Sequence, residues 1–168
     1  MTLTTHAIIG AAAAKIFSMN PLLAGIAAFA SHFLIDAIPH WDYHPSSFTT
    51  DDADPLNDNM EIGKDFFFDL VFISLDALWG IFFSLLLFWP ADPYQLSIII
   101  GGAILGILPD PLQFVYWKTR IEPFTTIQKF HIWIHSGNKK LLDRPLIGMV
   151  LQVMLALSVV VPVIYFSA

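Results

Sequence analysis

Two long apolar stretches constrain the fold of this chain more than any other feature of its sequence. The first, residues 64–89, forms a helix about 36 Å long if it is fully α-helical, and the hydrocarbon core of a bilayer is ~30 Å thick. The second, residues 145–166, is apolar throughout. Charged side chains make up only 13% of the residues, whereas a soluble domain carries roughly 25%. The sequence therefore excludes an ordinary cytosolic enzyme and predicts a polytopic membrane protein.

A helical hairpin is predicted over residues 3–38. Asn20-Pro21 divides it into helices over 3–19 and 21–38, because proline is tolerated in the first turn of a helix but not in its interior. Both helices are rich in alanine and glycine, and small residues let helices approach closely within lipid. The hairpin is therefore expected to be buried within a bundle.

The segment after the first long stretch predicts another helix, over residues 94–108. It carries Gly102 and Gly106 four residues apart, a spacing that favours a close helix crossing. Pro109-Asp110-Pro111 follows and is expected to end the helix abruptly.

Two polar segments complete the chain. Residues 42–64 form an acidic loop, and residues 111–144 are mixed in character. Within the second segment, apolar residues recur at helical spacing over 124–135, and Trp133 suits the headgroup zone of a membrane. We therefore expect an interfacial helix there.

The predicted fold is all-α, a polytopic membrane bundle of about five transmembrane helices plus one interfacial helix. It forms a single domain over residues 1–168. Its parts are the hairpin 3–38, the acidic loop 42–64, the helices 64–89 and 94–108, the interfacial segment 111–144 and the helix 145–166.

Basic residues indicate the orientation of such a bundle. With five spans, every Lys and Arg except Lys15 falls on the side of the N-terminus: Lys64, Lys118, Arg120, Lys129, Lys139, Lys140 and Arg144. Lysine and arginine concentrate on the cytoplasmic side of membrane proteins. The sequence therefore predicts a cytoplasmic N-terminus in a bacterial-type inner membrane.

The composition also excludes several kinds of partner and site. The net charge of −6 argues against nucleic acid as a partner, because phosphate contacts need clustered Lys and Arg. The chain has no cysteine, so a transition metal would have to be held by histidine and carboxylate. Membrane lipid is the partner that the apolar stretches imply.

Histidine and aspartate gather on the predicted cytoplasmic side. His32, Asp36 and His40 are spaced at i, i+4 and i+8, which places them on one face of a helix. His131 and His135 repeat the i, i+4 spacing. Ionisable groups within an apolar helix are costly unless they face a partner or an ion. We therefore expect a divalent metal, zinc by preference and one or two ions.

Counting along the helices from the cytoplasmic side places further ligands at a similar depth. His6, Asp36 and Asp69 each fall within about two turns of a helix end on that side. The full set of expected metal ligands is His6, His32, Asp36, His40, Asp69, His131 and His135. Asp110 or Asp42 is expected to act as general base. Asp76 and Lys15, deeper in the membrane, are expected to form a structural ion pair.

Four short motifs resemble the YdjM-type family of small bacterial membrane proteins, which are predicted to be metal-dependent hydrolases. The matching segments are Thr5-His6-Ala7-Ile8-Ile9-Gly10, His32-Phe33-Leu34-Ile35-Asp36, Leu108-Pro109-Asp110 and His131-Ile132-Trp133-Ile134-His135-Ser136. They are similar in style to motifs of zinc-dependent phospholipase C. The last segment is one residue shorter than the family's motif and lacks its arginine, a common phosphate-binding group. The resemblance implies a metal-dependent phosphoester or lipid hydrolase.

Three functions are compatible with these residues. The leading hypothesis is a membrane-embedded metal-dependent hydrolase that acts on a phosphoester or ester of a lipid-like substrate at the cytoplasmic membrane boundary. A small metal or proton transporter would use the same buried His and Asp as a transit site. A structural membrane protein would use a metal only to stabilise its helices. The far half of the membrane is almost wholly apolar, which favours a one-sided site over transport.

Overall fold

The computed structural model describes residues 1–135, 141 and 143–167 of the chain. Three residues of the sequence interpretation lie outside this range. They are Ser136 of the last motif and the basic residues Lys139 and Lys140.

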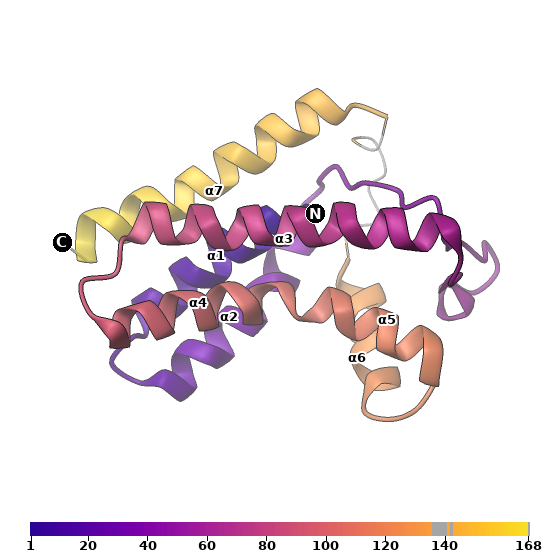
Figure 1. Ribbon diagram of the computed structural model, residues 1–168, viewed down its shortest axis with the longest axis horizontal. Coiled ribbons are helices and arrows are strands. Elements are labelled where there is room, and N and C mark those ends of the chain that lie inside the picture. The colour runs from indigo at the N-terminus through magenta and orange to yellow at the C-terminus, as the bar shows by residue number, and fades with distance from the viewer. Residues whose placement is uncertain (136–140, 142, 168) are drawn as a thin grey trace.

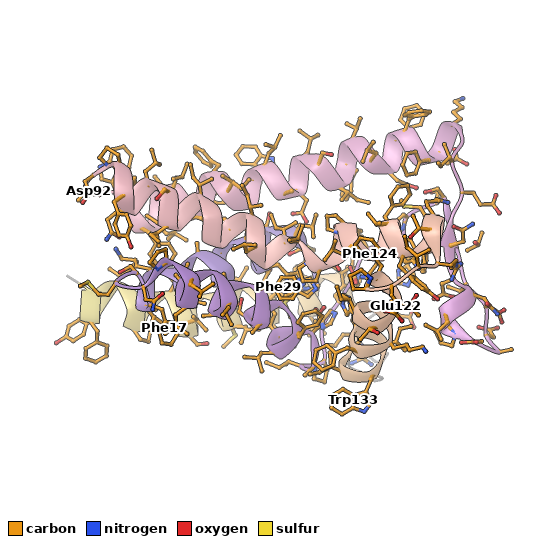
Figure 2. All side chains as sticks on the ribbon, turned by 90° about the horizontal axis from the view of Figure 1, so that it is seen from below. Phe17, Phe29, Asp92, Glu122, Phe124 and Trp133 are labelled. Atoms are coloured by element: carbon orange, nitrogen blue, oxygen red, sulfur yellow. The ribbon has the colours of Figure 1, made fainter. Side chains whose placement is uncertain are left out.

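Helices dominate the described residues, which confirms the all-α class. The α-helices are α1 (Leu3–Ile16), α2 (Pro21–Asp36), α3 (Lys64–Phe88), α4 (Pro93–Ile107), α5 (Pro109–Thr119), α6 (Phe124–Ile134) and α7 (Pro145–Ser167). Helices α3, α4 and α7 run along the long axis of the molecule (Figure 1). Phe17 and Asp92 mark one end, and Glu122, Phe124 and Trp133 lie toward the other (Figure 2).

The expectation of about five membrane spans is not confirmed. Two helices, α3 and α7, are long and apolar enough to cross a membrane, and α4 with α5 adds a third if that bent pair is one span. Helices α1 and α2 have only 14 and 16 residues. At 1.5 Å per residue they are about 21 and 24 Å long, short of the ~30 Å hydrocarbon core. Helix α1 ends at Ile16 and helix α2 at Asp36, whereas the predicted helices of the hairpin extended to residues 19 and 38.

The proline pair after α4 starts a helix, contrary to the predicted abrupt end. Helix α5 begins at Pro109, and its axis is bent by 43° from that of α4. Both Pro109 and Pro111 lie in the first turn of α5, where a missing backbone N–H costs little. The Leu112 N–H still donates to the Leu108 carbonyl at 3.2 Å across the junction. The chain therefore changes direction here while remaining helical, and this bend sets the position of Asp110.

The acidic segment 42–64 is more ordered than a simple loop. It contains a short antiparallel pair of strands, β1 (Phe48–Thr49) and β2 (Asn59–Met60), around a 3-10 turn over Pro55–Asn57. The Tyr116 hydroxyl of α5 donates to the Leu56 carbonyl at 3.1 Å. Lys118 of α5 donates to the Asn59 side chain at 2.8 Å. These bonds fix the segment against α5.

Helix α1 forms the centre of the bundle, and glycine allows α4 to approach it closely. A Cβ atom added at Gly106 would lie 2.5 Å from the His6 carbonyl oxygen. One added at Gly10 would lie 2.5 Å from the Gly102 carbonyl oxygen. No larger residue fits either position without separating the helices. The predicted close crossing through Gly102 and Gly106 is thus the contact between α4 and α1.

Two polar side chains attach the beginning of α1 to its neighbours. Asp76 of α3 accepts from the Leu3 N–H at 2.6 Å and from the Thr4 hydroxyl at 2.7 Å. This arrangement replaces the predicted ion pair between Asp76 and Lys15, because the free N–H groups at a helix start are strong donors. Gln152 of α7 accepts from the Thr2 N–H at 3.1 Å. The start of α1 is therefore held from two sides.

Replacing Gly106 with alanine is expected to lower the apparent thermal unfolding midpoint of the purified protein. The added methyl group clashes with the backbone of α1, and overpacking of this kind costs about 1–3 kcal/mol. Gly101 is the matched control, because a Cβ there meets no atom within 4 Å. Gly101→Ala is expected to preserve or raise the midpoint. Equal midpoints for the two variants would contradict the close packing of α1 against α4.

Candidate metal centre

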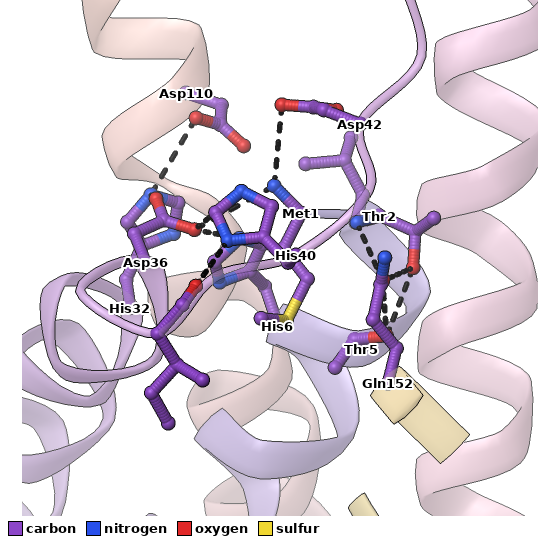
Figure 3. A network of polar contacts seen from close by, with 12 residues as sticks. Met1, Thr2, Thr5, His6, His32, Asp36, His40, Asp42, Asp110 and Gln152 are labelled. Carbon is purple, nitrogen blue, oxygen red and sulfur yellow. Dashed lines mark hydrogen bonds and ion pairs between the residues drawn. The ribbon is translucent and has the colours of Figure 1, made fainter. Parts of the chain in front are cut away.

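Histidine and aspartate side chains from five segments converge where α1 begins and α2 ends (Figure 3). The convergent residues are His6 of α1, His32 and Asp36 of α2, His40 and Asp42 of the following segment, Asp110 of α5, and His131 and His135 of α6 and its C-terminal flank. Most of these side chains are removed from solvent, and His6, His32, Asp36 and His131 are among the most deeply buried of the structure.

The Asp36 carboxylate lies at the centre of the cluster, and its two oxygens face different histidines. Oδ2 lies 3.0 Å from Nε2 of His131 and 3.1 Å from Nε2 of His32. Oδ1 lies 3.2 Å from Nε2 of His6 and 3.8 Å from Nε2 of His40. Only 1% of this side chain is exposed. Every predicted ligand except Asp69 thus lies at or beside this one carboxylate.

Backbone carbonyls fix the orientation of two of the histidines. Nδ1 of His32 lies 2.8 Å from the Gly106 carbonyl oxygen, and Nδ1 of His40 lies 2.7 Å from that of Ile38. A carbonyl oxygen accepts only, so each Nδ1 carries the proton and donates it. The Nε2 atom of each ring therefore faces the cluster and offers its lone pair there when that nitrogen is unprotonated. Metal-binding histidines are commonly oriented by the same type of bond.

Several buried polar atoms at the centre have no hydrogen-bond partner among the described residues. They include Nε2 of His6, Nε2 of His32 and Oδ1 of Asp36. Leaving a buried polar group without a partner costs roughly 1–3 kcal/mol, so native proteins seldom do so. A cation between the nitrogen lone pairs and the carboxylate oxygens satisfies these atoms together. The residues present therefore fit a metal ion.

Two sets of side chains can each hold an ion, and they share Asp36. In each set, one ligand atom per residue lies within 4.8 Å of all the others. The sets are His32, Asp36, Asp110 and His131, and Asp36, His40 and His135. His6 belongs to neither set, although its ring stacks on that of His32 with centroids 3.8 Å apart.

A second layer of polar side chains supports the carboxylate of Asp110. The Gln113 amide donates to Oδ1 of Asp110 at 2.9 Å, and the Gln128 amide donates to Gln113 at 3.3 Å. Such outer partners hold metal ligands in place. The sequence interpretation missed both glutamines, because an amide side chain is not distinctive in α5 and α6, which also carry other polar residues.

The cluster is more open on the side of its two outer carboxylates. Asp110 and Asp42 have 28% and 34% of their side chains exposed, whereas His6 and His32 are fully covered. In Figure 3, Asp110 and Asp42 both lie above the histidines. Oδ2 of Asp42 also lies 3.2 Å from the amino group of Met1. Water can therefore approach the cluster past these carboxylates.

Burial shifts the pKa values of the loop residues in the cluster. It lowers the pKa of His40 to about 4 and also lowers the pKa of His135. Both rings are therefore neutral at pH 7, the form in which histidine binds a metal. Burial raises the pKa of the Asp42 carboxyl above its ordinary value.

Asp69 lies away from the cluster, and the predicted alignment of helix depths was wrong. Its carboxylate accepts from the Ser47 N–H at 2.8 Å and from the Ser47 hydroxyl at 2.6 Å. The sequence prediction assumed that α1 and α3 begin at the same height. Instead, Leu3 at the start of α1 meets Asp76, which lies twelve residues, or about 18 Å, beyond the start of α3 at Lys64.

No protein-family model, no curated protein and no solved structure matches this chain. The resemblance of its short motifs to the YdjM-type family stays a prediction. Its function therefore has to be inferred from the geometry of its own residues.

Replacing Asp36 with asparagine is expected to weaken metal binding by more than about 100-fold. Loss of an outer partner alone costs roughly 10- to 100-fold, and Asp36 lies at the centre of the ligand set. The measurement is the metal content of the purified protein by inductively coupled plasma mass spectrometry. Asp69→Asn serves as control and is expected to retain the metal. Equal metal contents of the two variants would rule out the site.

Proposed function

We propose that this protein is a membrane-embedded metal-dependent hydrolase that acts on a phosphoester or ester of a lipid-like substrate. The observation that carries the proposal is the single cluster of five histidines and three aspartates, buried on one side and partly exposed on the other. A buried ligand set with an accessible side is typical of catalytic metal sites, whereas structural sites are closed.

A membrane location is supported by the exposed surfaces of α3 and α7. Both helices are long and apolar enough to cross a membrane. Large apolar side chains remain exposed along them, among them Phe68 and Phe72 of α3 and Met154 and Val161 of α7. Lipid is the environment that accepts such surfaces without penalty. A polytopic bundle with its N-terminus in the cytoplasm remains our proposal for the topology.

The proposed reaction needs metal ligands and a general base, and residues of the cluster can supply both. A divalent metal, zinc by preference, supplies Lewis acidity and lowers the pKa of a water molecule. His32, Asp36, His131 and Asp110 hold the metal. Asp42 belongs to neither ligand set, and 34% of its side chain is exposed. We assign Asp42 the role of general base because its carboxylate lies at the open side and is not needed as a metal ligand.

Apolar surface beside the cluster supports a substrate with a lipid tail. The Phe33 ring lies against both His131 and Phe130, with centroid separations of 5.4 and 5.0 Å. Phe130 and Trp133 of α6 are 43% and 76% exposed. A polar head group could thus reach the metal while its acyl chain stays against these rings.

Transport of a metal or proton and a purely structural metal remain the competing functions. A transporter needs polar groups along both halves of its path. The cluster instead occupies one end of α1 and α2, and the core beyond it contains Ala11, Ala14, Ala28 and Ile99. This distribution favours a one-sided reaction site. Hydrolytic activity distinguishes an enzyme from a protein in which the metal only stabilises the helices.

Removal of the metal is expected to abolish hydrolysis reversibly. The purified protein in detergent is assayed against phospholipids and lipid esters before chelation, after chelation and after addition of Zn²⁺. Activity is expected to disappear on chelation and to return with Zn²⁺, because the metal supplies the Lewis acid. Metal-loaded protein that hydrolyses neither substrate class would favour the structural function.

Asp42→Asn is expected to lower kcat by about 10²- to 10⁴-fold, the usual contribution of a general base. Its metal content is expected to stay at the wild-type value, since Asp42 belongs to neither ligand set. Asp52→Asn, at an exposed position in the same segment, is the control and is expected to keep full activity. An Asp42→Asn enzyme with unchanged kcat would eliminate Asp42 as the base.

A further inference from the structure

We infer that the cluster holds a second metal ion, bound by Asp36, His40 and His135, and that this ion is the one that contacts the substrate. The first ion is the one assigned to His32, Asp36, Asp110 and His131 under the proposed function, on which this inference rests. Asp36 is the residue common to the two ligand sets and would serve both ions.

The orientation of the Asp36 carboxylate supports a bridge. Oδ2 faces His32 and His131, at 3.1 and 3.0 Å, and belongs to the first position. Oδ1 faces His40 at 3.8 Å, with Nε2 of His6 at 3.2 Å and the Met1 amino nitrogen at 3.5 Å, and none of these contacts among the described residues is a hydrogen bond. Two ions held by one carboxylate lie about 3.5–4 Å apart, as in other two-metal hydrolytic sites.

Each of two segments supplies one histidine to each position. In the first segment, His32 and His40 lie four residues before and after Asp36. In the second, His131 and His135 are four residues apart, and the His135 N–H donates to the His131 carbonyl at 2.9 Å, which continues the helical turn. The His40 and His135 rings lie 4.9 Å apart. Helical spacing thus supplies the first position, whereas His40, which was predicted on the same helix face as Asp36, comes from the non-helical segment after α2.

The two positions differ in how many protein groups surround them. The first has four, His32, Asp36, Asp110 and His131, which is a complete tetrahedral set for zinc. The second has three among the described residues and so leaves one coordination position for water or a substrate oxygen. Three protein ligands with an open position are typical of catalytic zinc. We therefore place the substrate at the second ion.

The balance of charge favours an anionic substrate. Two divalent cations outweigh the three nearby carboxylates of Asp36, Asp42 and Asp110. A net positive site attracts phosphate oxygens more strongly than the neutral carbonyl of an ester. Within the proposed substrate range, the two-ion site therefore favours a phosphoester. Two ions also stabilise the attacking and leaving oxygens of a phosphoryl transfer.

The first experiment measures stoichiometry. Full-length protein in detergent is stripped with chelator, saturated with Zn²⁺, desalted and analysed by mass spectrometry for metal and by amino-acid analysis for protein. The wild type is expected to hold two ions. The double variant His40→Ala/His135→Ala is expected to hold one, and the control His44→Ala, which removes an exposed histidine nearby, is expected to hold two.

The second experiment uses Mn²⁺ and electron paramagnetic resonance on the same proteins. Two Mn²⁺ ions bridged by Asp36 are expected to give an exchange-coupled spectrum. The double variant is expected to give the six-line signal of an isolated ion and to lose phosphoester hydrolysis by more than 100-fold. Circular dichroism and the thermal unfolding midpoint show whether the double variant is folded.

The outcomes separate this inference from the proposed function. A wild type that saturates at one ion and hydrolyses its substrate overturns the second ion and leaves the one-ion hydrolase intact. Two ions in the double variant place the second ion elsewhere and also overturn the inference. A wild type without metal overturns both proposals. The inference itself also fails if the wild type holds two ions and the double variant keeps full activity.

Discussion

The buried carboxylate of Asp36 is the constraint on which the rest of the site depends. Its negative charge is removed from water, which is costly without compensation, and the described residues offer four histidine nitrogens around it. Those histidines come from α1, α2 and α6 and from the segment after α2. The helices therefore have to converge at one point. The bend before Asp110 and the contacts of α5 with the acidic segment hold α5 in the position that this convergence requires.

Local spacing predicted much of the candidate site. His32 and Asp36 are separated by one helical turn in an apolar segment, a pattern that depends only on helix geometry. The i, i+4 pair His131 and His135 gave a second such pattern, and α6 begins at the predicted residue. The helical class followed from the apolar stretches themselves. Each of these predictions concerns contacts within a few residues along the chain.

Predictions that depended on how the helices pack against one another failed. Asp69 was placed beside His6 because both lie near a helix end, but the start of α1 packs about 18 Å beyond the start of α3. Helix α5 was missed because Pro109 and Pro111 can end one helix or begin the next, and only the surrounding packing decides. The roles of Gln113 and Gln128 likewise depend on tertiary contacts that the sequence pattern does not record.

The position of Gly106 links helix packing directly to ligand chemistry. Its missing side chain lets α4 approach α1, and its carbonyl oxygen fixes the imidazole of His32. A displacement of α4 away from both α1 and α2, the helix that carries His32, therefore also releases the proton on Nδ1 of His32 from its acceptor. The ring can then rotate or change tautomer, and Nε2 no longer points reliably at Asp36. The spacing between two backbones thus determines whether this histidine can act as a ligand.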